Sequence, residues 1–362
     1  MGDELEPAYL KNNIVVVFEC SEMFVPYLSV ALSSLVETVT DAYNYDVIIL
    51  NCEIKRQDEV KLKNICQDKN NISIRFFDPT SIVENDIEKA VHNYLYLNYY
   101  RLALPWILLN YEKIVNLGVD IIIEEDISKL YTISLDENYY IAGALDLGYQ
   151  GRLGIDIPLS ELKLTNPFQY INADVLVLDL KKIRENYSKN EIMCEWEKNY
   201  FRYAEQDALN VIFDGHIQKI DSRWNVFPDK TDTVRQIEKS PKDSIRLWRE
   251  CLKQPYIIHY AGVPKPWEDA LIGFGDKWWK YARQSIYYEE IVRRMCVYGI
   301  PDRRGIMRRL LETICPPSTK RRVITDKIFA YKSIGWKFGK CIQNFFEGTN
   351  EKIYGVQDTE RK

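Results

Sequence analysis

The sequence predicts an α/β protein with a mixed, mostly parallel sheet and helices on both faces. Short β-branched runs, such as IVVVF at residues 14–18, alternate with segments whose apolar residues recur at helical spacing, such as residues 26–39. Parallel strands need a crossover connection, which is usually a helix. The alternation therefore favours an open sheet with both faces covered.

The remaining predicted elements continue this alternation along the chain. Residues 149–166 are rich in glycine and polar residues, and their length suits a loop that closes over a site. Strands are predicted at residues 46–50, 72–77, 141–145, 170–180 and 256–260 and around Asp120, and helices at residues 55–69 and 182–203.

Composition indicates a globular protein large enough for more than one domain. The chain has 362 residues, of which 46% are hydrophobic and 28% are charged. The first residues form no apolar signal segment, and no apolar stretch approaches the roughly 18 residues needed to cross a bilayer. We therefore expect a cytoplasmic protein. Its eight cysteines include no C-x-x-C pair, so neither zinc-site spacing nor a disulfide framework is present.

Positive charge is concentrated towards the C-terminal end. Residues 293–342 contain 13 lysines and arginines against three acids, whereas the whole chain has a net charge of −5. Aromatic residues such as Trp336 and Phe338 are interleaved with them, which suits peripheral binding to an anionic membrane surface. The alternative is a helical cap with solvated arginines. Nucleic acid is disfavoured as a partner, because no recognised motif accompanies the charge and an acidic main body repels phosphates.

One acid stands in an apolar context. Within residues 111–131, Asp120 lies between two apolar runs. A strand whose carboxyl end presents this acid to a crevice fits the pattern. The competing interpretation is a solvated acid at a strand end, because charged residues rarely enter cores unpaired.

Seven separated segments, taken in their order and spacing, resemble the retaining nucleotide-sugar glycosyltransferases of family 8. The resemblance covers roughly residues 13–268, and its most specific part is the histidine, glycine and Lys-Pro-Trp of the last segment. The segments are VVVFECSEMFVPYLSVALSSL near the start, YYRLALP at 99–105, IVNLGVDIIIEEDISKLY at 114–131, AGALD at 142–146, YINADVLVLDL at 170–180, AEQDALN at 204–210 and HYAGVPKPW at 259–267.

The resemblance implies a fold, a division into domains and a function. Residues 1–268 are expected to form a nucleotide-sugar-binding catalytic domain of GT-A type, and residues 269–362 a helical, basic and aromatic extension. The implied activity is transfer of a hexose from a UDP-sugar to a glycan or lipid-linked acceptor, with retention of configuration. Such hexosyltransferases serve surface-polysaccharide biosynthesis.

Sugar transfer from a nucleotide diphosphate needs positive charge beside the leaving diphosphate, which a divalent metal and a lysine supply. By resemblance, Asp120 and His259 are two protein ligands of Mn²⁺ (or Mg²⁺), and Lys265 meets the phosphates. Gly262 lets the backbone approach closely.

Other residues match donor-site or reaction-site positions of the family. Each also has an ordinary structural interpretation, such as an exposed helix arginine, a loop acid or a polar helix start. Phe24 is expected to stack on the base. Arg101, Asp146 and Asn172 are expected to lie near the donor sugar. Gln206 is expected to lie beside the reacting anomeric carbon, and Asp207, the next residue, is expected to be catalytic together with Gln206 and Asp146.

Four departures from the family pattern fall in the nucleotide and metal site. Gly118 replaces the first acid of a D-x-D motif, which weakens the expected metal binding. Ser21 and Met23 change the turn that contacts the base, and Glu205 replaces an aspartate. Asp174 replaces a glycine, and it is a candidate for restoring the lost charge.

These departures keep other functions open. One alternative is a non-catalytic relative that retains the fold and acts as a binding or scaffold partner. Another is a transferase that uses a different nucleotide base or no metal. Intact Asp120, His259, Lys265, Gln206 and Asp146 favour the UDP-sugar enzyme.

Overall fold

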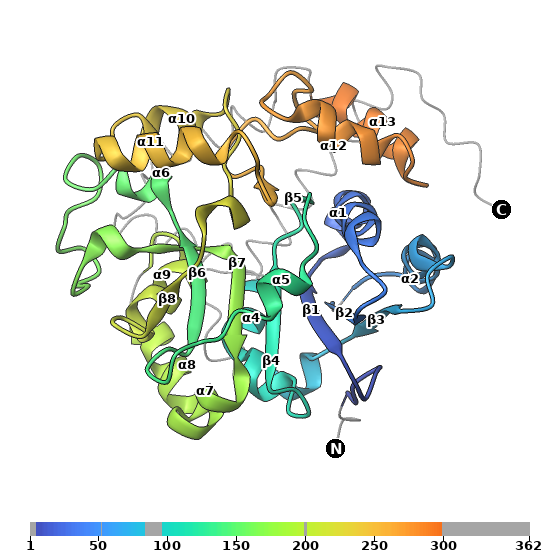
Figure 1. Cartoon of the computed structure of the whole chain (residues 1–362), viewed down its shortest axis with the longest axis horizontal. Coiled ribbons are helices and arrows are strands. Elements are labelled where there is room, and N and C mark those ends of the chain that lie inside the picture. Colours follow the sequence, from blue (N-terminus) through green and yellow to red (C-terminus); the bar gives the residue numbers. More distant parts are fainter. Residues whose placement is uncertain (1–4, 52, 84–95, 199–200, 299–362) are drawn as a thin grey trace, which may run out of the picture. The chain divides into compact units, whose positions relative to one another are not determined.

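The computed structural model describes residues 5–51, 53–83, 96–198 and 201–298, all within one compact unit (Figure 1). Its main sheet has seven strands in the order β3-β2-β1-β4-β7-β6-β8. The strands β3, β2, β1 and β4 pair in parallel, as do β6 and β8, whereas β7 runs antiparallel to both of its neighbours. The predicted mixed, mostly parallel sheet is confirmed. The bounds are β1 Asn13–Glu19, β2 Asn44–Leu50, β3 Ile72–Phe77, β4 Lys113–Leu117, β6 Ile141–Leu145, β7 Ile171–Asp179 and β8 Ile217–Lys219.

Helices cover both faces of this sheet. On one face, α1 packs its Leu28 and Leu32 in one core cluster with Val16 and Phe18 of β1. On the other face, α4 contacts β1, α7 contacts β4 and α9 contacts β7. The helices are α1 Val25–Thr38, α2 Arg56–Lys63, α4 Tyr96–Ile107, α5 Ser128–Tyr131, α6 Leu147–Gln150, α7 Leu180–Asn186, α8 Lys189–Lys198, α9 Ala204–Ile212, α10 Asp232–Ile237, α11 Lys242–Cys251, α12 Gly275–Ala282 and α13 Tyr288–Tyr298, with single 3-10 turns at Glu22–Phe24, Asn64–Cys66, Pro167–Gln169 and Ser222–Trp224.

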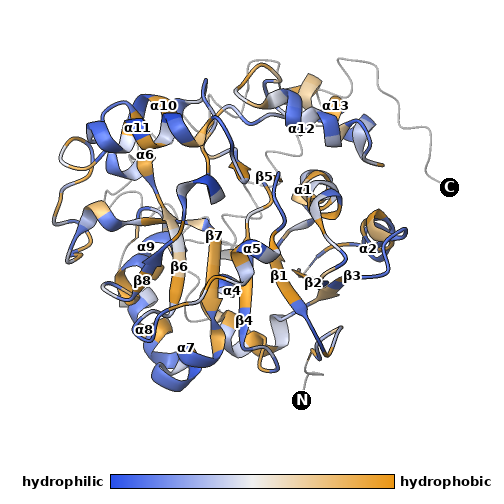
Figure 2. Cartoon of the chain, viewed as in Figure 1, coloured by the Kyte–Doolittle hydropathy of each residue, from blue (hydrophilic) through white to orange (hydrophobic). Residues whose placement is uncertain are grey.

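The central strands are apolar along most of their length, as Figure 2 shows for β1, β4, β6 and β7. In β1, six of the seven residues are buried. Alternate residues of a strand face opposite sides of its sheet, so a strand covered on both faces is apolar at successive positions rather than at every second one. The run at residues 14–18 has this pattern for that reason.

The apolar segment around Asp120, predicted as a strand that ends at this acid, contains two strands. Strand β4 ends at Leu117, and residues 118–120 form a turn that leaves the main sheet. Strand β5, Ile121–Ile123, then pairs antiparallel with β9, Ile257–His259, in a separate two-stranded sheet. Residues 114–117 of β4 and all of β5 are buried, so the periodicity of apolar residues cannot distinguish one long strand from two short ones.

The predicted helix at residues 182–203 is also divided. Its first part, α7, ends at Asn186, and the next residue, Tyr187, has an extended backbone. Ser188 then starts α8 with a capping box: its N–H donates to Oε2 of Glu191 at 2.7 Å, and the N–H of Glu191 donates back to Oγ of Ser188 at 3.3 Å.

The stretch predicted as a polar loop at residues 149–166 contains buried residues. Tyr149 stacks on Tyr170, with ring centroids 3.6 Å apart, and Leu153 and Ile157 complete a small apolar cluster. The loop is therefore packed against Tyr170, the residue before β7, and its closure over a ligand stays a prediction.

Two described helices belong to the region predicted as a C-terminal extension. Both α12 and α13 pack against α1 (Figure 1). The boundary at residue 268 stays a prediction, and most of the basic segment proposed for membrane binding lies outside the described residues, from residue 299 onwards. Within the described part of the chain, no helix combines the length and hydrophobicity needed to cross a membrane.

Candidate functional site

The candidate site residues gather at one edge of the main sheet. The parallel strands β1 and β4 end there, and β6 ends beside them. Because β7 runs antiparallel to β4, its first residues lie next to the last residues of β4. This edge therefore collects Asp120 from the turn after β4, Asn172 and Asp174 from β7, and Asp146 from the end of β6. Ligands of open α/β sheets bind at such an edge.

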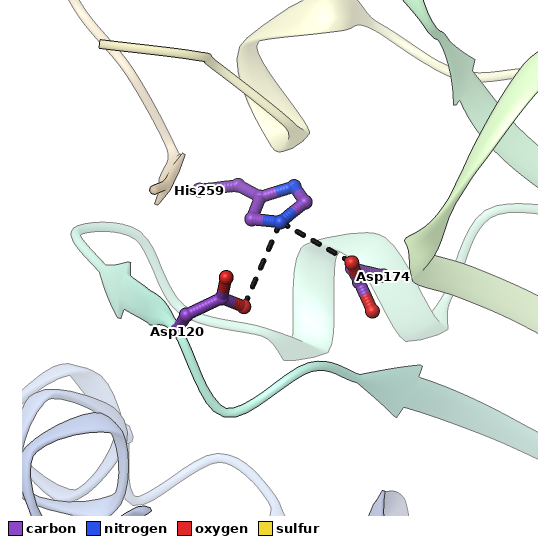
Figure 3. A group of neighbouring side chains, drawn as sticks. All are labelled: Asp120, Asp174 and His259. Carbon is purple, nitrogen blue, oxygen red and sulfur yellow. Dashed lines mark ion pairs between the residues drawn. The ribbon is translucent and has the colours of Figure 1, made fainter. Parts of the chain in front are cut away.

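Three side chains converge there from separate segments: Asp120, Asp174 and His259 (Figure 3). The distance from Nε2 of His259 is 3.2 Å to Oδ2 of Asp174 and 3.6 Å to Oδ1 of Asp120. One potential ligand atom from each residue lies within 4.8 Å of the other two. The structure thus brings together the two predicted metal ligands and adds Asp174 to them.

Each of these three side chains is fixed by a second contact. Oδ2 of Asp120 accepts from Nζ of Lys265 at 2.5 Å, and Oδ1 of Asp174 accepts from Nη1 of Arg101 at 3.1 Å. Nδ1 of His259 lies 2.8 Å from Oδ1 of Asn225. The remaining atoms, Oδ1 of Asp120, Oδ2 of Asp174 and Nε2 of His259, point towards one another.

Asn225 determines which ring nitrogen of His259 can act as a ligand. Its Nδ2 donates to Oδ1 of Asn172 at 2.9 Å, so its own Oδ1 is the acceptor that faces His259. Nδ1 of His259 must therefore carry a hydrogen, and Nε2 can offer a lone pair to a cation between the carboxylates. A second partner of this kind is typical of metal-binding histidines.

Electrostatics favours a positive charge in the centre of this cluster. Burial raises the pKa of Asp120, but Lys265 and His259 outweigh it and hold that pKa well below its usual range. Burial also lowers the pKa of His259, but the two carboxylates outweigh it and raise this pKa to about 9. Near neutral pH Nε2 therefore carries a proton in addition to the one on Nδ1, and a metal ion would have to displace the proton on Nε2 to bind there.

The donor set fits a divalent cation such as Mn²⁺ or Mg²⁺. Two carboxylate oxygens and an imidazole nitrogen are ligands that Mn²⁺ accepts, and the side chain of Asp174 is 33% exposed, so further oxygen ligands can come from solvent or substrate. When all four carboxyl groups are ionised and His259 is neutral, the surrounding formal charge is −2, because Glu19, Asp120, Asp174 and Glu205 outnumber the cations Arg101 and Lys265.

Arg101 links the cluster to the end of β1. It projects from α4, is 8% exposed, and pairs with Glu19 at 3.2 Å and with Asp174 and Glu205 at 3.1 Å each. Burial of Glu205 raises its pKa to about 7, even though Arg101 counteracts this effect. Arg101 thus holds three acids together, and its predicted contact with a donor sugar stays a prediction.

The predicted reaction residues form one hydrogen-bonded network beside the cluster. Nδ2 of Asn172 donates to Oε1 of Gln206 at 3.0 Å and to Oδ2 of Asp146 at 3.1 Å. Nε2 of Gln206 donates to the same Asp146 oxygen at 3.1 Å. Because Asn225 joins Asn172 to His259, this network runs without a break from the metal cluster to Gln206.

Three other predicted site residues make contacts of their own. Both carboxylate oxygens of Asp207 are occupied, because they accept from the hydroxyl of Tyr170 at 2.6 Å and the N–H of Tyr203 at 2.8 Å. Phe24 packs partly buried at the start of α1. Gly262 has φ +80°, and an added Cβ would lie 2.3 Å from the side chains at residues 232 and 233, so the close approach there is to this chain itself.

Asn225 is a site residue that the sequence analysis missed, and no motif marks it. We expect Asn225→Leu to weaken Mn²⁺ binding by about 10–100-fold, because His259 loses the partner that orients it. Asn225→Asp keeps an acceptor for Nδ1 and should retain most of the affinity. Calorimetric titration with Mn²⁺ checks both variants, and equal affinity of Asn225→Leu and the wild type would separate Asn225 from the metal site.

Comparison with known proteins shows the family. The model of glycosyl transferase family 8 matches residues 15–270. The chain belongs to this family. It is therefore a glycosyltransferase, as the resemblance of its separated motifs implied.

Relatives and solved structures agree with this assignment. Lipopolysaccharide 1,2-glucosyltransferase of Escherichia coli (strain K12) is 26% identical over an alignment of 202 positions that covers 52% of this chain and 54% of the relative. The apo structure of the bifunctional glycosyltransferase WbbM matches with a TM-score of 0.73 at 21% identity, over 81% of this chain and 53% of WbbM. The galactosyltransferase LgtC, solved with donor and acceptor sugar analogs, matches with a TM-score of 0.61 at 21% identity, over 75% of this chain and 96% of LgtC. The predicted GT-A-like fold is thereby confirmed.

Proposed function

We propose that this glycosyltransferase moves a hexose from a UDP-sugar to a glycan or glycolipid acceptor, with retention of configuration, in surface-polysaccharide biosynthesis. The observation that carries the proposal is the continuity between the cluster of Asp120, Asp174 and His259 and the network of Asn172, Gln206 and Asp146. Diphosphate and sugar of one donor can therefore lie side by side at the sheet edge. Two relatives support the chemistry, since one is named for lipopolysaccharide glucosyl transfer and LgtC was solved with donor and acceptor sugar analogs.

In this proposal Mn²⁺ (or Mg²⁺) at the cluster supplies positive charge to the leaving diphosphate. Lys265 lies close enough to assist, because its ammonium already binds Asp120 and the carbonyl of Tyr260 at 2.7 Å. A lysine held beside the metal ligands can turn to a phosphate oxygen without leaving the site. Lys265, and the cation that Asp120 would hold, thus both favour a charged leaving group.

Gln206 is proposed to position the donor sugar. An amide is a poor nucleophile, and both ends of this one are hydrogen-bonded: Oε1 accepts from Asn172 and from the N–H of Ala173, and Nε2 donates to Asp146. We therefore favour attack by the acceptor on the same face that the diphosphate leaves, with the departing phosphate taking the acceptor's proton.

The acceptor class also bears on the place of action. A lipid-linked acceptor lies at a membrane, and the basic segment at residues 293–342 would suit the inner face of that membrane, where anionic lipids attract lysine and arginine. We propose peripheral attachment on this basis, with the enzyme itself in the cytoplasm.

Calorimetric titration with UDP, UDP-glucose and UDP-galactose, with and without Mn²⁺, tests the donor. We expect binding of UDP that requires Mn²⁺ and is lost when EDTA is added. GDP and ADP serve as matched ligands, because they carry the same diphosphate on a different base. Preference for either would identify another nucleotide, and absence of binding by any nucleotide would contradict the proposed function.

A further inference from the structure

Residues 118 and 174 lie directly opposite each other at the end of the β4–β7 pair. The antiparallel register pairs Leu117 with Val175, so the next rung joins Gly118 to Asp174. The N–H of Gly118 donates to the carbonyl of Asp174 at 2.9 Å. Side chains of opposed residues in an antiparallel pair occupy neighbouring space on one face of the sheet.

The side chain of Asp174 occupies the space that a side chain at residue 118 would need. A Cβ added to Gly118 would lie 2.9 Å from Oδ1, 3.0 Å from Cγ and 3.1 Å from Cβ of Asp174. The backbone of Gly118 does not itself require glycine, since the glycines with positive φ in the described chain are at residues 154, 215 and 262. The neighbouring carboxylate is what leaves residue 118 without a side chain.

Asp174 has the contacts expected of a metal ligand. Arg101 holds its Oδ1, which leaves Oδ2 facing Nε2 of His259 at 3.2 Å. Ligand atoms around Mn²⁺ or Mg²⁺ lie about 3 Å apart when each is about 2.1 Å from the ion. The separation of Oδ2 and Nε2 is close to this value before any ion binds.

We propose that Asp174 is the third protein ligand of the metal, and that it supplies from β7 the carboxylate that a residue at position 118 would otherwise supply from β4. Relative to the family pattern, the acid and the glycine of the opposed pair 118 and 174 are exchanged: position 118 has the glycine, and position 174 has the acid. The inference rests on the proposed function, because it names the ligands of the metal that the donor diphosphate requires. It also removes the main argument for a non-catalytic relative, since the number of carboxylates at the cluster is preserved.

Exchange of the two residues tests this inference. Mn²⁺ affinity is measured by calorimetry for the wild type, Asp174→Gly and the double variant Gly118→Asp/Asp174→Gly. We expect Asp174→Gly to weaken Mn²⁺ binding at least about tenfold, and the double variant to return it to within about threefold of the wild type. The increase in Tm caused by Mn²⁺ should likewise be smaller for Asp174→Gly than for the wild type, and it should recover in the double variant.

Two further variants separate ligation from support of Arg101. Asp174→Asn keeps the size of the side chain and an acceptor for Arg101 but removes the charge, so it should lose Mn²⁺ affinity without losing Tm in the absence of metal. Gly118→Asp alone introduces a clash with Asp174 and should not strengthen binding. The inference would be overturned if Asp174→Gly bound Mn²⁺ with wild-type affinity. It would also be overturned if the double variant folded but did not recover Mn²⁺ affinity. Either result would leave the proposed function standing, whereas a wild-type protein that binds Mn²⁺ but no nucleotide would contradict that function and leave the ligand assignment intact.

Discussion

Asp120→Asn is expected to lower kcat/KM for sugar transfer by about 10²–10³-fold, with loss of measurable Mn²⁺ binding. The substitution keeps the shape of the side chain but removes the charge that pairs with Lys265 at 2.5 Å and faces His259 at 3.6 Å. Only one carboxylate then remains at the cluster. Steady-state transfer from the donor found by titration, measured over a range of Mn²⁺ concentrations, gives the effect on kcat/KM.

Glu124→Gln is the matched control for this variant. Glu124 lies four residues further along the same segment, and it pairs with Lys277 of α12 rather than with the cluster. Loss of this charge should leave transfer and Mn²⁺ affinity close to the wild-type values. An Asp120→Asn enzyme that keeps its metal dependence would show that the metal binds elsewhere.

The fold was predictable because its signals are local. The first three strands are short runs rich in β-branched or aromatic residues, and α1 shows apolar residues at helical spacing, so composition and periodicity within about ten residues suffice to predict them. Prediction was incomplete where two buried strands, ending at Leu117 and beginning at Ile121, follow each other with only three residues between them. The direction in which β5 leaves the sheet depends on its pairing with β9, more than 130 residues away in the sequence.

The candidate site was predictable only in part. Asp120, His259 and Lys265 belong to motifs, and the structure places all three in contact. Asp174 was recognised as an acid where glycine is usual, but its relation to Gly118 follows from the register of β4 and β7, which no local pattern encodes. Asn225 gave no signal, because a hydrogen bond to a histidine 34 residues later leaves no spacing rule in the sequence.

Arg101→Leu is expected to destabilise the folded protein by about 3–5 kcal/mol, because it leaves buried acids without their cation. The side chains of Glu19 and Glu205 are only 3% and 14% exposed, so water cannot replace the guanidinium. Urea unfolding of the metal-free protein measures the change. Arg246→Leu is the control: its side chain is 77% exposed and pairs with an exposed aspartate, so the expected change is within about 0.5 kcal/mol.

The destabilisation by Arg101→Leu should depend on pH, and the direction identifies its cause. Burial already raises the pKa of Glu19 and, to about 7, that of Glu205 while Arg101 is present, and removing Arg101 raises both further. A carboxyl whose pKa is higher in the folded protein than in the unfolded chain binds more protons when folded, so stability falls as pH rises through the interval between the two pKa values. The difference in unfolding free energy between wild type and variant should therefore be larger at pH 8 than at pH 5. A difference that does not change with pH would mean that Arg101 stabilises the fold by packing its side chain rather than by neutralising the acids.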